Sequence, residues 1–268
     1  MKKTILITGS TNGIGKLAAL RMANEGHALY IHGRNKEKVE SSIAEIIAKT
    51  KNLNVSGFVA DLSELDEVKR LSAAVSKDLS HIDVLINNAG VYNSSESMNS
   101  AGLDMRFVVN YLAPYLLTDL LLPLLEGSSN PRIINLSSAA QSSVSIDALV
   151  GNERRSESDT YAQSKLAITM WSFYLAKQKP NISVLALNPG SLLNTRMVRE
   201  AFGQSWSSPD KGASIIFDLA VSDFYEKMSG LYFDNDRGNF GKAHKDAYDH
   251  DLIKELINQT ELLLGKHE

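Results

Sequence analysis

Cysteine is absent from this chain of 268 residues, and proline and tryptophan are scarce, with six and two residues. Without cysteine the protein can form no disulfide, no thiolate nucleophile and no thiolate metal site. The six histidines show no paired spacing that would place two metal ligands on one helix face. Asp234 and Asp236 stand close together but have no further ligand residues beside them, so we expect no metal centre.

An excess of charge and a long hydrophobic run are missing as well. Lys and Arg number 28 against 31 Asp and Glu, a formal net charge of -3, and no basic run points to nucleic acid. The most apolar segment, 112–125, is interrupted by Asp119 and Pro123 and is shorter than the roughly 20 residues that cross a bilayer. The residues ahead of Thr8 are too few for a signal-peptide core. We therefore expect a cytoplasmic protein with no membrane span and no nucleic-acid partner.

What the chain does contain is an alternation of short apolar strands with helical patterns. Apolar runs typical of a parallel sheet that is covered on both faces occur at 4–8, 28–32, 55–60, 84–87, 132–136, 183–187 and 231–233. Helical patterns occur at 13–25, 36–50, 64–79, 100–125, 160–178, 208–222 and 250–264. With 43% hydrophobic residues and no linker or repeat, the sequence predicts a single α/β domain over residues 1–268. We expect a doubly wound Rossmann fold with about seven parallel strands flanked by helices.

A glycine-rich segment follows the first predicted strand and opens the first predicted helix. Its glycines would allow a tight turn, a close approach of backbone N–H groups to a pyrophosphate, and exposure of the helix N-terminus to negative charge. We therefore assign cofactor contacts to the whole turn, which comprises Gly9, Ser10, Thr11, Asn12, Gly13, Ile14 and Gly15. The pattern is also compatible with a strand-to-helix turn that binds nothing.

Tyr161 and Lys165 are four residues apart in a helical pattern and so share one helix face. An ammonium beside a phenol favours the phenolate, so that Tyr161, with an ordinary pKa of roughly 10, could act as an acid or base near neutral pH. Ser138 precedes the pair and could donate a hydrogen bond to a substrate oxygen on which charge develops. The alternative is an ordinary surface pair on an amphipathic helix. Behind a dinucleotide-binding turn, the three residues indicate hydride-transfer chemistry.

Taken together, these motifs resemble the compact branch of the short-chain dehydrogenase/reductase family over essentially the whole chain. The resemblance rests on TGSTNGIG at 8–15, the run Asn87-Asn88-Ala89-Gly90, Asn110, Ser138, YAQSK at 161–165 and Asn188-Pro189-Gly190. The INLSSAA segment, the FGK tail and the long stretch between Ser138 and Tyr161 are similar to the retinol-dehydrogenase-like reductases. The resemblance implies a Rossmann-fold oxidoreductase that acts on a small-molecule carbonyl or alcohol substrate.

The resemblance also implies a role for each matching catalytic residue. Tyr161 would be the general acid in reduction and the base in oxidation, while Lys165 would lower its pKa and hold the nicotinamide ribose. Ser138 would polarise the substrate carbonyl. Because side chains alternate along a strand, its neighbour Ser137 would face away and be structural. Asn110 would lend its main-chain carbonyl to a water-linked proton relay to Lys165.

Pro114 gives Asn110 a physical argument of its own. Proline has no N–H to donate to the carbonyl four residues back, which here belongs to Asn110. The helix should kink at this point and leave an oxygen that a water can bind. The alternative, equally compatible with the spacing, is that Pro114 only shapes packing.

The end of the second predicted strand bears on the choice of cofactor. An NAD enzyme usually has a carboxylate there for the ribose 2′-hydroxyl, whereas this chain has Gly33 and then Arg34, which suits a 2′-phosphate. We therefore expect NADP(H), with NAD(H) as an alternative, although Asn12 stands where many phosphate-preferring relatives have a second basic residue. By resemblance, further cofactor contacts come from Asp61, Leu62, Asn88, Ala89, Gly90, Tyr161, Lys165, Pro189, Gly190 and Thr195.

Two segments without a regular pattern, 139–160 and 191–208, are expected to recognise the substrate. Met197, Phe202 and Trp206 in the second segment could line an apolar pocket or pack into the core. The resemblance further implies a homodimer or homotetramer that forms through the helices at 100–125 and 160–178. The apolar residues of these helices could form such an interface or could instead cover the sheet; they are Leu112, Leu116, Leu120, Leu121, Met170 and Phe173.

Two other classes of function compete with this interpretation. An NADP(H)-binding sensor or interaction protein should lack Tyr161 or Lys165, and both are present. A nucleotide-sugar epimerase or dehydratase should have a GxxGxxG turn and a larger C-terminal substrate domain, which a chain of 268 residues does not match. The sequence therefore predicts an NADP(H)-dependent oxidoreductase whose substrate it does not identify.

Overall fold

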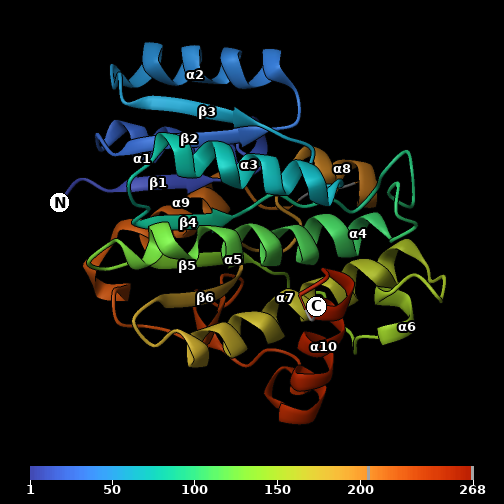
Figure 1. The fold of residues 1–268 in the computed structure, drawn as a ribbon. Coiled ribbons are helices and arrows are strands. Elements are labelled where there is room, and N and C mark those ends of the chain that lie inside the picture. Colours follow the sequence, from blue (N-terminus) through green and yellow to red (C-terminus); the bar gives the residue numbers. More distant parts are fainter. Residues whose placement is uncertain (204–205, 267–268) are drawn as a thin grey trace.

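A computed structural model describes residues 1–203 and 206–266 (Figure 1). Their strands form one sheet in the order β3-β2-β1-β4-β5-β6-β7-β8, parallel throughout except between β7 and β8. The strands are β1 (Thr4–Ile7), β2 (Ala28–Gly33), β3 (Val55–Val59), β4 (Val84–Asn87), β5 (Arg132–Leu136), β6 (Ser183–Asn188), β7 (Leu231–Asp234) and β8 (Asn239–Gly241). The predicted Rossmann fold is confirmed, with the short antiparallel β8 as an addition that the sequence pattern does not predict.

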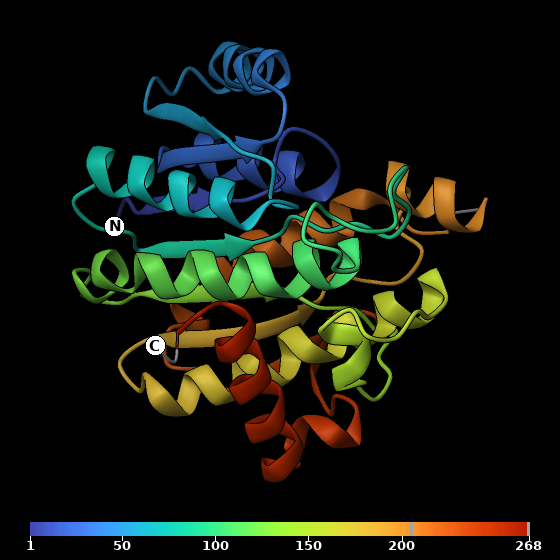
Figure 2. The ribbon, with the colours of Figure 1, turned by 45° about the vertical axis from the view of Figure 1, so that its right-hand side comes forward.

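Helices cover both faces of this sheet (Figures 1 and 2). One face carries α1 (Gly13–Asn24), α2 (Lys36–Thr50) and α9 (Pro209–Val221), and the other carries α3 (Leu65–Asp78), α5 (Ala113–Glu126) and α7 (Glu157–Gln178). Each layer of helices packs on its own cluster of buried apolar side chains. Because both faces are covered, a ligand can reach the sheet only at an edge.

The edge where the parallel strands end is the one that carries the irregular segments. The short helices α4 (Met105–Phe107), α6 (Ile146–Leu149) and α8 (Arg196–Phe202) lie there, on the right of Figure 1. The strand order reverses direction between β1 and β4, which leaves a switch point at this edge. Doubly wound folds bind their ligands at such a point.

The helix predicted over 100–125 starts later and is interrupted. α4 leads into a π-helical turn at Val108–Leu112, which continues directly into α5. In the turn, the Ala113 N–H donates to the Val108 carbonyl, five residues back. Pro114 follows and has no N–H to give. The irregularity predicted around Asn110 is therefore present, in the form of a π turn that joins two helices.

The segment Met105–Glu126, which contains α4, the π turn and α5, is the one stretch in the described part of the chain that is long and apolar enough to cross a membrane. Its most apolar window is 72% buried inside the fold. The apolar character is that of a core helix, which contacts α3 on one side and α7 on the other.

The last helix, α10 (His250–Leu263), packs over α7 and reaches the start of α5. Tyr111 and Thr260 share a hydrogen bond of 2.8 Å between their hydroxyls, and the Tyr115 hydroxyl donates to Glu261 at 3.2 Å. This face contains the apolar side chains that were candidates for an oligomer interface. Most of them are buried within the single chain, namely Leu112, Leu116, Leu121, Met170 and Phe173, and Leu120 is 38% exposed.

Candidate active site

The glycine turn between β1 and α1 makes the close approaches that its sequence predicts. Gly9 and Gly13 have φ angles of +62° and +58°, a region that favours glycine. A Cβ at Gly9 would lie 2.7 Å from the Ala89 Cα, and one at Gly15 would overlap the Asn88 amide. The turn therefore packs directly against the segment that follows β4, at the switch point of the sheet.

Asn88 holds this turn in place. Its Nδ2 donates to the main-chain carbonyls of Thr8 and Gly9, at 2.8 and 2.9 Å. In return, the Thr8 hydroxyl accepts from the N–H groups of Asn88 and Ala89, at 3.0 Å each. Asn88 and Ala89, which were predicted to lie at the cofactor, thus also shape the turn that would bind its pyrophosphate.

His32, in β2, is buried and supports the glycine turn through hydrogen bonds. The sequence did not predict this role. Its Nδ1 accepts from the Gly9 N–H at 3.2 Å, and its Nε2 lies 3.1 Å from the Ala60 carbonyl. Burial lowers the pKa of His32 to about 4, so the ring is neutral at pH 7, and its proton is on Nε2 because Nδ1 accepts. The sequence feature that could have indicated this role is a histidine within an otherwise apolar strand.

Ser10 belongs to the same hydrogen-bonded support. Its N–H donates to the His32 carbonyl at 2.9 Å, and its hydroxyl donates to the Ile7 carbonyl at 2.8 Å. The fold already uses both of these donors and buries the residue completely, so the predicted cofactor contact of Ser10 stays a prediction.

Arg34 follows β2 at the same edge of the sheet and is exposed. Gly33, directly before it, packs against the glycine turn, since a Cβ there would lie 2.6 Å from the Thr11 Cγ2. The main chain of Arg34 thus starts beside the turn. This placement is the one that a role in binding a ribose 2′-phosphate requires.

Asp61 and Leu62 follow β3 at the neighbouring strand end. The Asp61 Oδ1 accepts from the Ser63 N–H at 3.0 Å and from its hydroxyl at 2.8 Å, and Leu62 is 5% exposed. The carboxylate is therefore oriented by its own loop, in the place where the resemblance puts the adenine.

Tyr161, Ser138 and Lys165 come together at the carboxyl end of β5. The Tyr161 hydroxyl is hydrogen-bonded to the Ser138 side chain. The Lys165 Nζ lies 5.7 Å from the centroid of the Tyr161 ring and donates to the Leu136 carbonyl at 2.8 Å. Gly90 faces this group, because a Cβ there would lie 3.5 Å from the Lys165 Nζ. The structure thus places the three predicted catalytic side chains together, beside the segment that supports the glycine turn.

The protein surroundings favour the neutral forms of both ionisable groups. Burial raises the pKa of Tyr161, and the hydrogen bond from Ser138 offsets only part of that effect. Burial lowers the pKa of Lys165 to about 7. The prediction that Lys165 depresses the pKa of Tyr161 is therefore wrong for the protein groups alone, because the amine is desolvated and bonds to a carbonyl. A phenol that is neutral at pH 7 is in the form that donates a proton.

Ser137, directly after β5, faces the interior, as the prediction of opposite sides for the two serines requires. Its hydroxyl donates to the Lys165 carbonyl at 3.0 Å and shares a hydrogen bond of 2.7 Å with the Thr169 hydroxyl. Ser137 therefore ties β5 to α7 and is structural, whereas its neighbour Ser138 faces Tyr161.

Asn110 joins two parts of the site through its side chain. Its Oδ1 accepts from the Val91 N–H at 2.8 Å, and its Nδ2 donates to the Val91 carbonyl and to the Ser164 hydroxyl, at 3.0 Å each. This clamp connects the segment after β4 to α7, next to Lys165. The proton relay through the Asn110 main-chain carbonyl stays a prediction.

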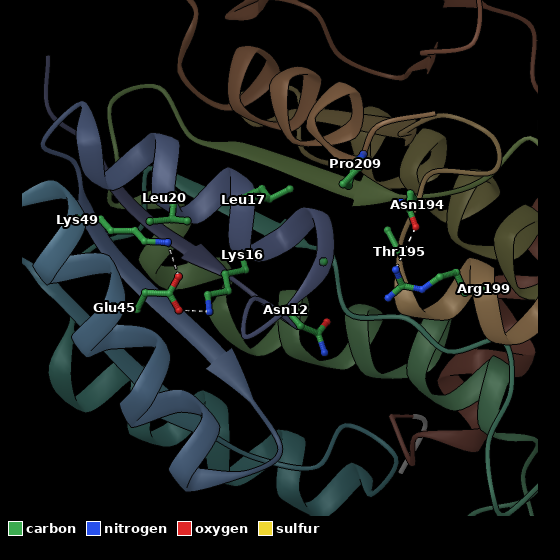
Figure 3. A pocket seen from close by; sticks show the side chains of 11 residues that line it. Asn12, Lys16, Leu17, Leu20, Glu45, Lys49, Asn194, Thr195, Arg199 and Pro209 are labelled. Carbon is green, nitrogen blue, oxygen red and sulfur yellow. Dashed lines mark hydrogen bonds and ion pairs between the residues drawn. The ribbon is translucent and has the colours of Figure 1, made fainter. Parts of the chain in front are cut away.

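The turn after β6 brings Pro189, Gly190 and Thr195 to the same edge, and Gly190 has a φ of +122°. A pocket of about 390 Å³ is lined by Asn12 and Gly13 of the glycine turn and by Thr195. Figure 3 shows Asn12 on one side of this pocket and Thr195 on the other. Thr195 therefore lies across a pocket from the glycine turn, as its predicted contact with the cofactor requires.

Basic side chains line this pocket (Figure 3). Glu45 forms ion pairs with Lys16 at 2.5 Å and Lys49 at 2.7 Å, and the hydrogen bonds from these lysines lower the pKa of Glu45 to about 2. Arg199 donates to the Asn194 Oδ1 at 3.1 Å. The excess of positive charge beside the glycine turn suits the phosphates of a dinucleotide.

Two segments, 139–160 and 191–208, were predicted to recognise the substrate. Segment 139–160 is bonded to α7, since the Ser145 N–H donates to the Gln163 Oε1 at 2.9 Å. In segment 191–208, Trp206 is 76% exposed and so does not pack into the core. The Phe202 side chain lies outside the described residues.

In the part of the chain that is described, no three His, Asp or Glu side chains gather in a way that could hold a metal ion.

Tyr92 is a further neighbour of Tyr161 that sequence reasoning missed. The two rings have centroids 4.8 Å apart and planes at 52°. Its position two residues after Gly90, directly behind the Asn-Asn-Ala-Gly run, was the signal that could have found it.

Known proteins are similar to this chain in sequence. A family model described as short chain dehydrogenase matches residues 3–206. Retinol dehydrogenase 13 of Mus musculus is 33% identical over 282 residues, an alignment that covers 98% of this chain and 84% of the relative. Retinol dehydrogenase 12 of Mus musculus is 34% identical, with 86% of this chain and 77% of the relative covered.

Solved structures agree with the fold. A protein from Mycobacterium paratuberculosis matches with a TM-score of 0.79 at 24% identity, over 98% of this chain and 93% of its own, which speaks for the fold alone. A short chain dehydrogenase from Escherichia coli CFT073, complexed with NADPH, matches with a TM-score of 0.72 at 26% identity, over 86% of this chain and 95% of its own.

Proposed function

The chain belongs to the short-chain dehydrogenase family, and from that premise we propose that it transfers a hydride between NADP(H) and a carbonyl or alcohol substrate, with Tyr161 as the general acid and base. The observation that carries this proposal is the meeting of Tyr161, Ser138 and Lys165 at the strand edge that also holds the glycine turn. A partly buried phenol, kept neutral by its raised pKa, and a serine hydroxyl converge there.

The residues at this edge fit a dinucleotide. Gly9 and Gly13 adopt the positive φ values of a tight turn, and no Cβ blocks the approach of a pyrophosphate to the backbone there. Thr195 would hold the cofactor from the opposite side of the pocket, and Asp61 and Leu62 would contact the adenine. The nicotinamide, when bound, supplies or accepts the hydride.

The remaining steps belong to side chains of this protein. Ser138 would donate a hydrogen bond to the substrate oxygen and so stabilise the negative charge that develops on it. Tyr161 would donate its phenolic proton to the same oxygen during reduction and take it back during oxidation. Lys165, 4% exposed and beneath the phenol, would bind the nicotinamide ribose and return a proton to Tyr161.

Replacement of Tyr161 by phenylalanine tests this function. Tyr161→Phe removes the proton donor and leaves the ring, so kcat for NADPH-dependent reduction should fall by about 100-fold or more while NADPH affinity changes little. The measurement is a screen of carbonyl substrates by NADPH consumption, with fluorescence titration of NADPH as the control. Substantial turnover in Tyr161→Phe would contradict the assignment, and tight NADPH binding without turnover in the natural sequence would favour a sensor.

The preference for NADP(H) over NAD(H) rests on Arg34. Arg34 is exposed and follows Gly33, which packs on the glycine turn, and the chain has no Asp or Glu at this strand end to bind a 2′-hydroxyl. Arg34→Asp should reverse the ratio of the NADPH and NADH dissociation constants, since a carboxylate repels a 2′-phosphate. Arg237→Asp, at an arginine beyond β7, is the control. An unchanged ratio in Arg34→Asp would contradict the assignment.

A cytoplasmic location is part of the same proposal. The apolar segment Met105–Glu126 is mostly inside the fold, so its apolar surface is not available to lipid. Recovery of the protein with membranes after cell lysis would contradict this location.

A further inference from the structure

Arg106 is a buried charge that the mechanism above does not use. Its side chain is 1% exposed, and a guanidinium is costly to bury unless it is paired and hydrogen-bonded. Arg132 is buried to the same degree, but it lies at the start of β5, at the opposite edge of the sheet from the active site. Among the arginines whose burial the structure describes, these two are buried, and Arg106 is the one near Tyr161.

The contacts of Arg106 join three segments around the active site. Its Nε donates to the Tyr92 carbonyl at 2.8 Å, in the segment after β4. One terminal nitrogen lies 3.3 Å from each carboxylate oxygen of Asp104, which caps α4, and the other forms an ion pair with Glu157. Glu157 is the first residue of α7. A planar guanidinium with several donors is suited to such a junction, whereas a lysine could not reach all three partners.

Two of these contacts lead to Tyr161. The ring of Tyr92 packs on the ring of Tyr161 at 4.8 Å between centroids. Glu157 stands four residues ahead of Tyr161 on α7 and so lies on the same helix face, one turn earlier. Arg106 therefore bonds to the main chain of Tyr92, whose ring packs on the phenol, and to Glu157, one helical turn before Tyr161.

We propose that Arg106 is a positioning residue for Tyr161, which holds the Tyr92 ring against the phenol and anchors the first turn of α7. The proposal rests on the role of Tyr161 as general acid in the proposed function. Without this anchor the Tyr92 ring can move away, water can reach the phenol, and the Tyr161 hydroxyl loses its fixed place beside Ser138. A displacement of about 1 Å at a reacting group can lower a rate about 100-fold.

A matched pair of variants separates positioning from general stability. Arg106→Met and Arg132→Met each remove a buried guanidinium, and both should lower the melting temperature. Only Arg106→Met should lower kcat, by about 10- to 100-fold, with the dissociation constant of NADPH within about twofold of the natural protein. Unchanged kcat in Arg106→Met, or an equal loss in Arg132→Met, would overturn the proposal.

A double-mutant cycle tests whether Arg106 acts through Tyr92. Tyr92→Ala should lower kcat, and its combination with Arg106→Met should cost little more than either change alone, because both remove the same support. Combined with Arg132→Met, the effect of Tyr92→Ala should be independent. Losses that multiply in the Arg106 and Tyr92 pair would count against the coupling.

The pKa of Tyr161 can be measured without turnover, so it tests the role of Arg106 independently of the proposed function. The groups facing the phenol are Tyr92 from the segment after β4, Ser138 from the end of β5, and Lys165 from α7 itself. Subtracting the ultraviolet titration of Tyr161→Phe from that of the natural protein isolates the titration of Tyr161. In Arg106→Met the pKa of Tyr161 should be lower, closer to that of an exposed phenol. If Arg106→Met does not fold, Glu157→Gln, at a side chain 53% exposed, should give the same downward shift. An unmoved titration would refute the role of Arg106, whatever the protein's activity.

Discussion

Ser137 and Ser138 are neighbours at the end of β5, but their hydroxyls have different partners. One step along an extended chain turns the side chain to the other side, so Ser137 meets α7 while Ser138 meets Tyr161. The environment of each group then sets its chemistry. The same holds for Lys165, whose burial against the Leu136 carbonyl decides its ionisation state.

Alanine at either serine should separate the two roles. Ser138→Ala removes the donor to the substrate oxygen and should lower kcat/KM by about 100- to 1,000-fold, with little change in stability. Ser137→Ala removes buried hydrogen bonds to α7 and should lower the free energy of unfolding by about 1 kcal/mol, with turnover within a few-fold. Steady-state kinetics and urea denaturation measure the two effects. Equal losses of activity would contradict the assignment of the two faces.

The pKa of Lys165 predicts a pH dependence of folding. Burial lowers this pKa from 10.5 to about 7 in the folded chain, so the fold disfavours the charged amine. The resulting decrease in the free energy of unfolding is absent above pH 10.5, grows as the pH falls, and is complete below about pH 7. In the absence of cofactor, Lys165→Met should therefore gain stability relative to the natural protein as the pH falls from 9.5 to 6.5. Thermal unfolding of both proteins at these two pH values measures the difference, and a constant difference would contradict the shift.

At the scale of elements, the π turn at Val108–Leu112 connects the backbone of α5 to the active site. Asn110 lies within this turn and clamps Val91 to Ser164 through its side chain. A π turn inserts one extra residue into a helical path, which changes the direction of the side chains that follow. The turn therefore determines how Asn110 reaches both the segment after β4 and α7.

Pro114→Ala tests whether this geometry serves catalysis. Alanine provides an N–H and a better helix former, so the π turn can close to a regular α-helix and stability should rise or stay nearly unchanged. Turnover should fall, because the Asn110 carbonyl would be taken up by the helix and proton delivery to Lys165 would slow. NADPH affinity should change little. Kinetics and thermal unfolding are the measurements, and a less stable variant with full turnover would make Pro114 a packing residue.

At the scale of the whole molecule, α10 occupies part of the face that the family resemblance assigns to an oligomer interface. Tyr111 and Tyr115 bond to Thr260 and Glu261 within the chain, and the apolar side chains around them are buried. Homo-oligomerisation through α5 and α7 stays a prediction. Of the apolar residues proposed for it, Leu120 is the one that remains substantially exposed, which makes it the test position.

Solution mass can decide this prediction. If α5 forms the interface, Leu120→Glu should shift the protein to the mass of one chain at micromolar concentration, because it buries a charge in an apolar contact. Leu53→Glu, at a leucine 79% exposed beside β3, should leave the mass unchanged. Light scattering after size exclusion measures both. A single-chain mass for the natural protein would remove the prediction.

The sequence by itself determined the fold class and named most of the candidate site residues. Apolar runs of strand length that alternate with helical patterns require a parallel sheet covered on both faces, and the glycine turn marks its ligand-binding edge. Ser138, Tyr161 and Lys165 were identified through spacing and family resemblance. These features are local, since each depends on residues within a few positions of one another or on a motif whose context is the next strand or helix.

Tertiary structure alone decided which groups are buried and what they meet. His32 bonds to Gly9 and Ser10 of the glycine turn because β2 and β1 are neighbours in the sheet, and Arg106 reaches Glu157 across 51 residues of sequence. The ionisation of Lys165 likewise follows from desolvation by segments far away along the chain. Contacts of this kind depend on how separate elements pack, and the free energy of burying a charge has no local signature in the sequence.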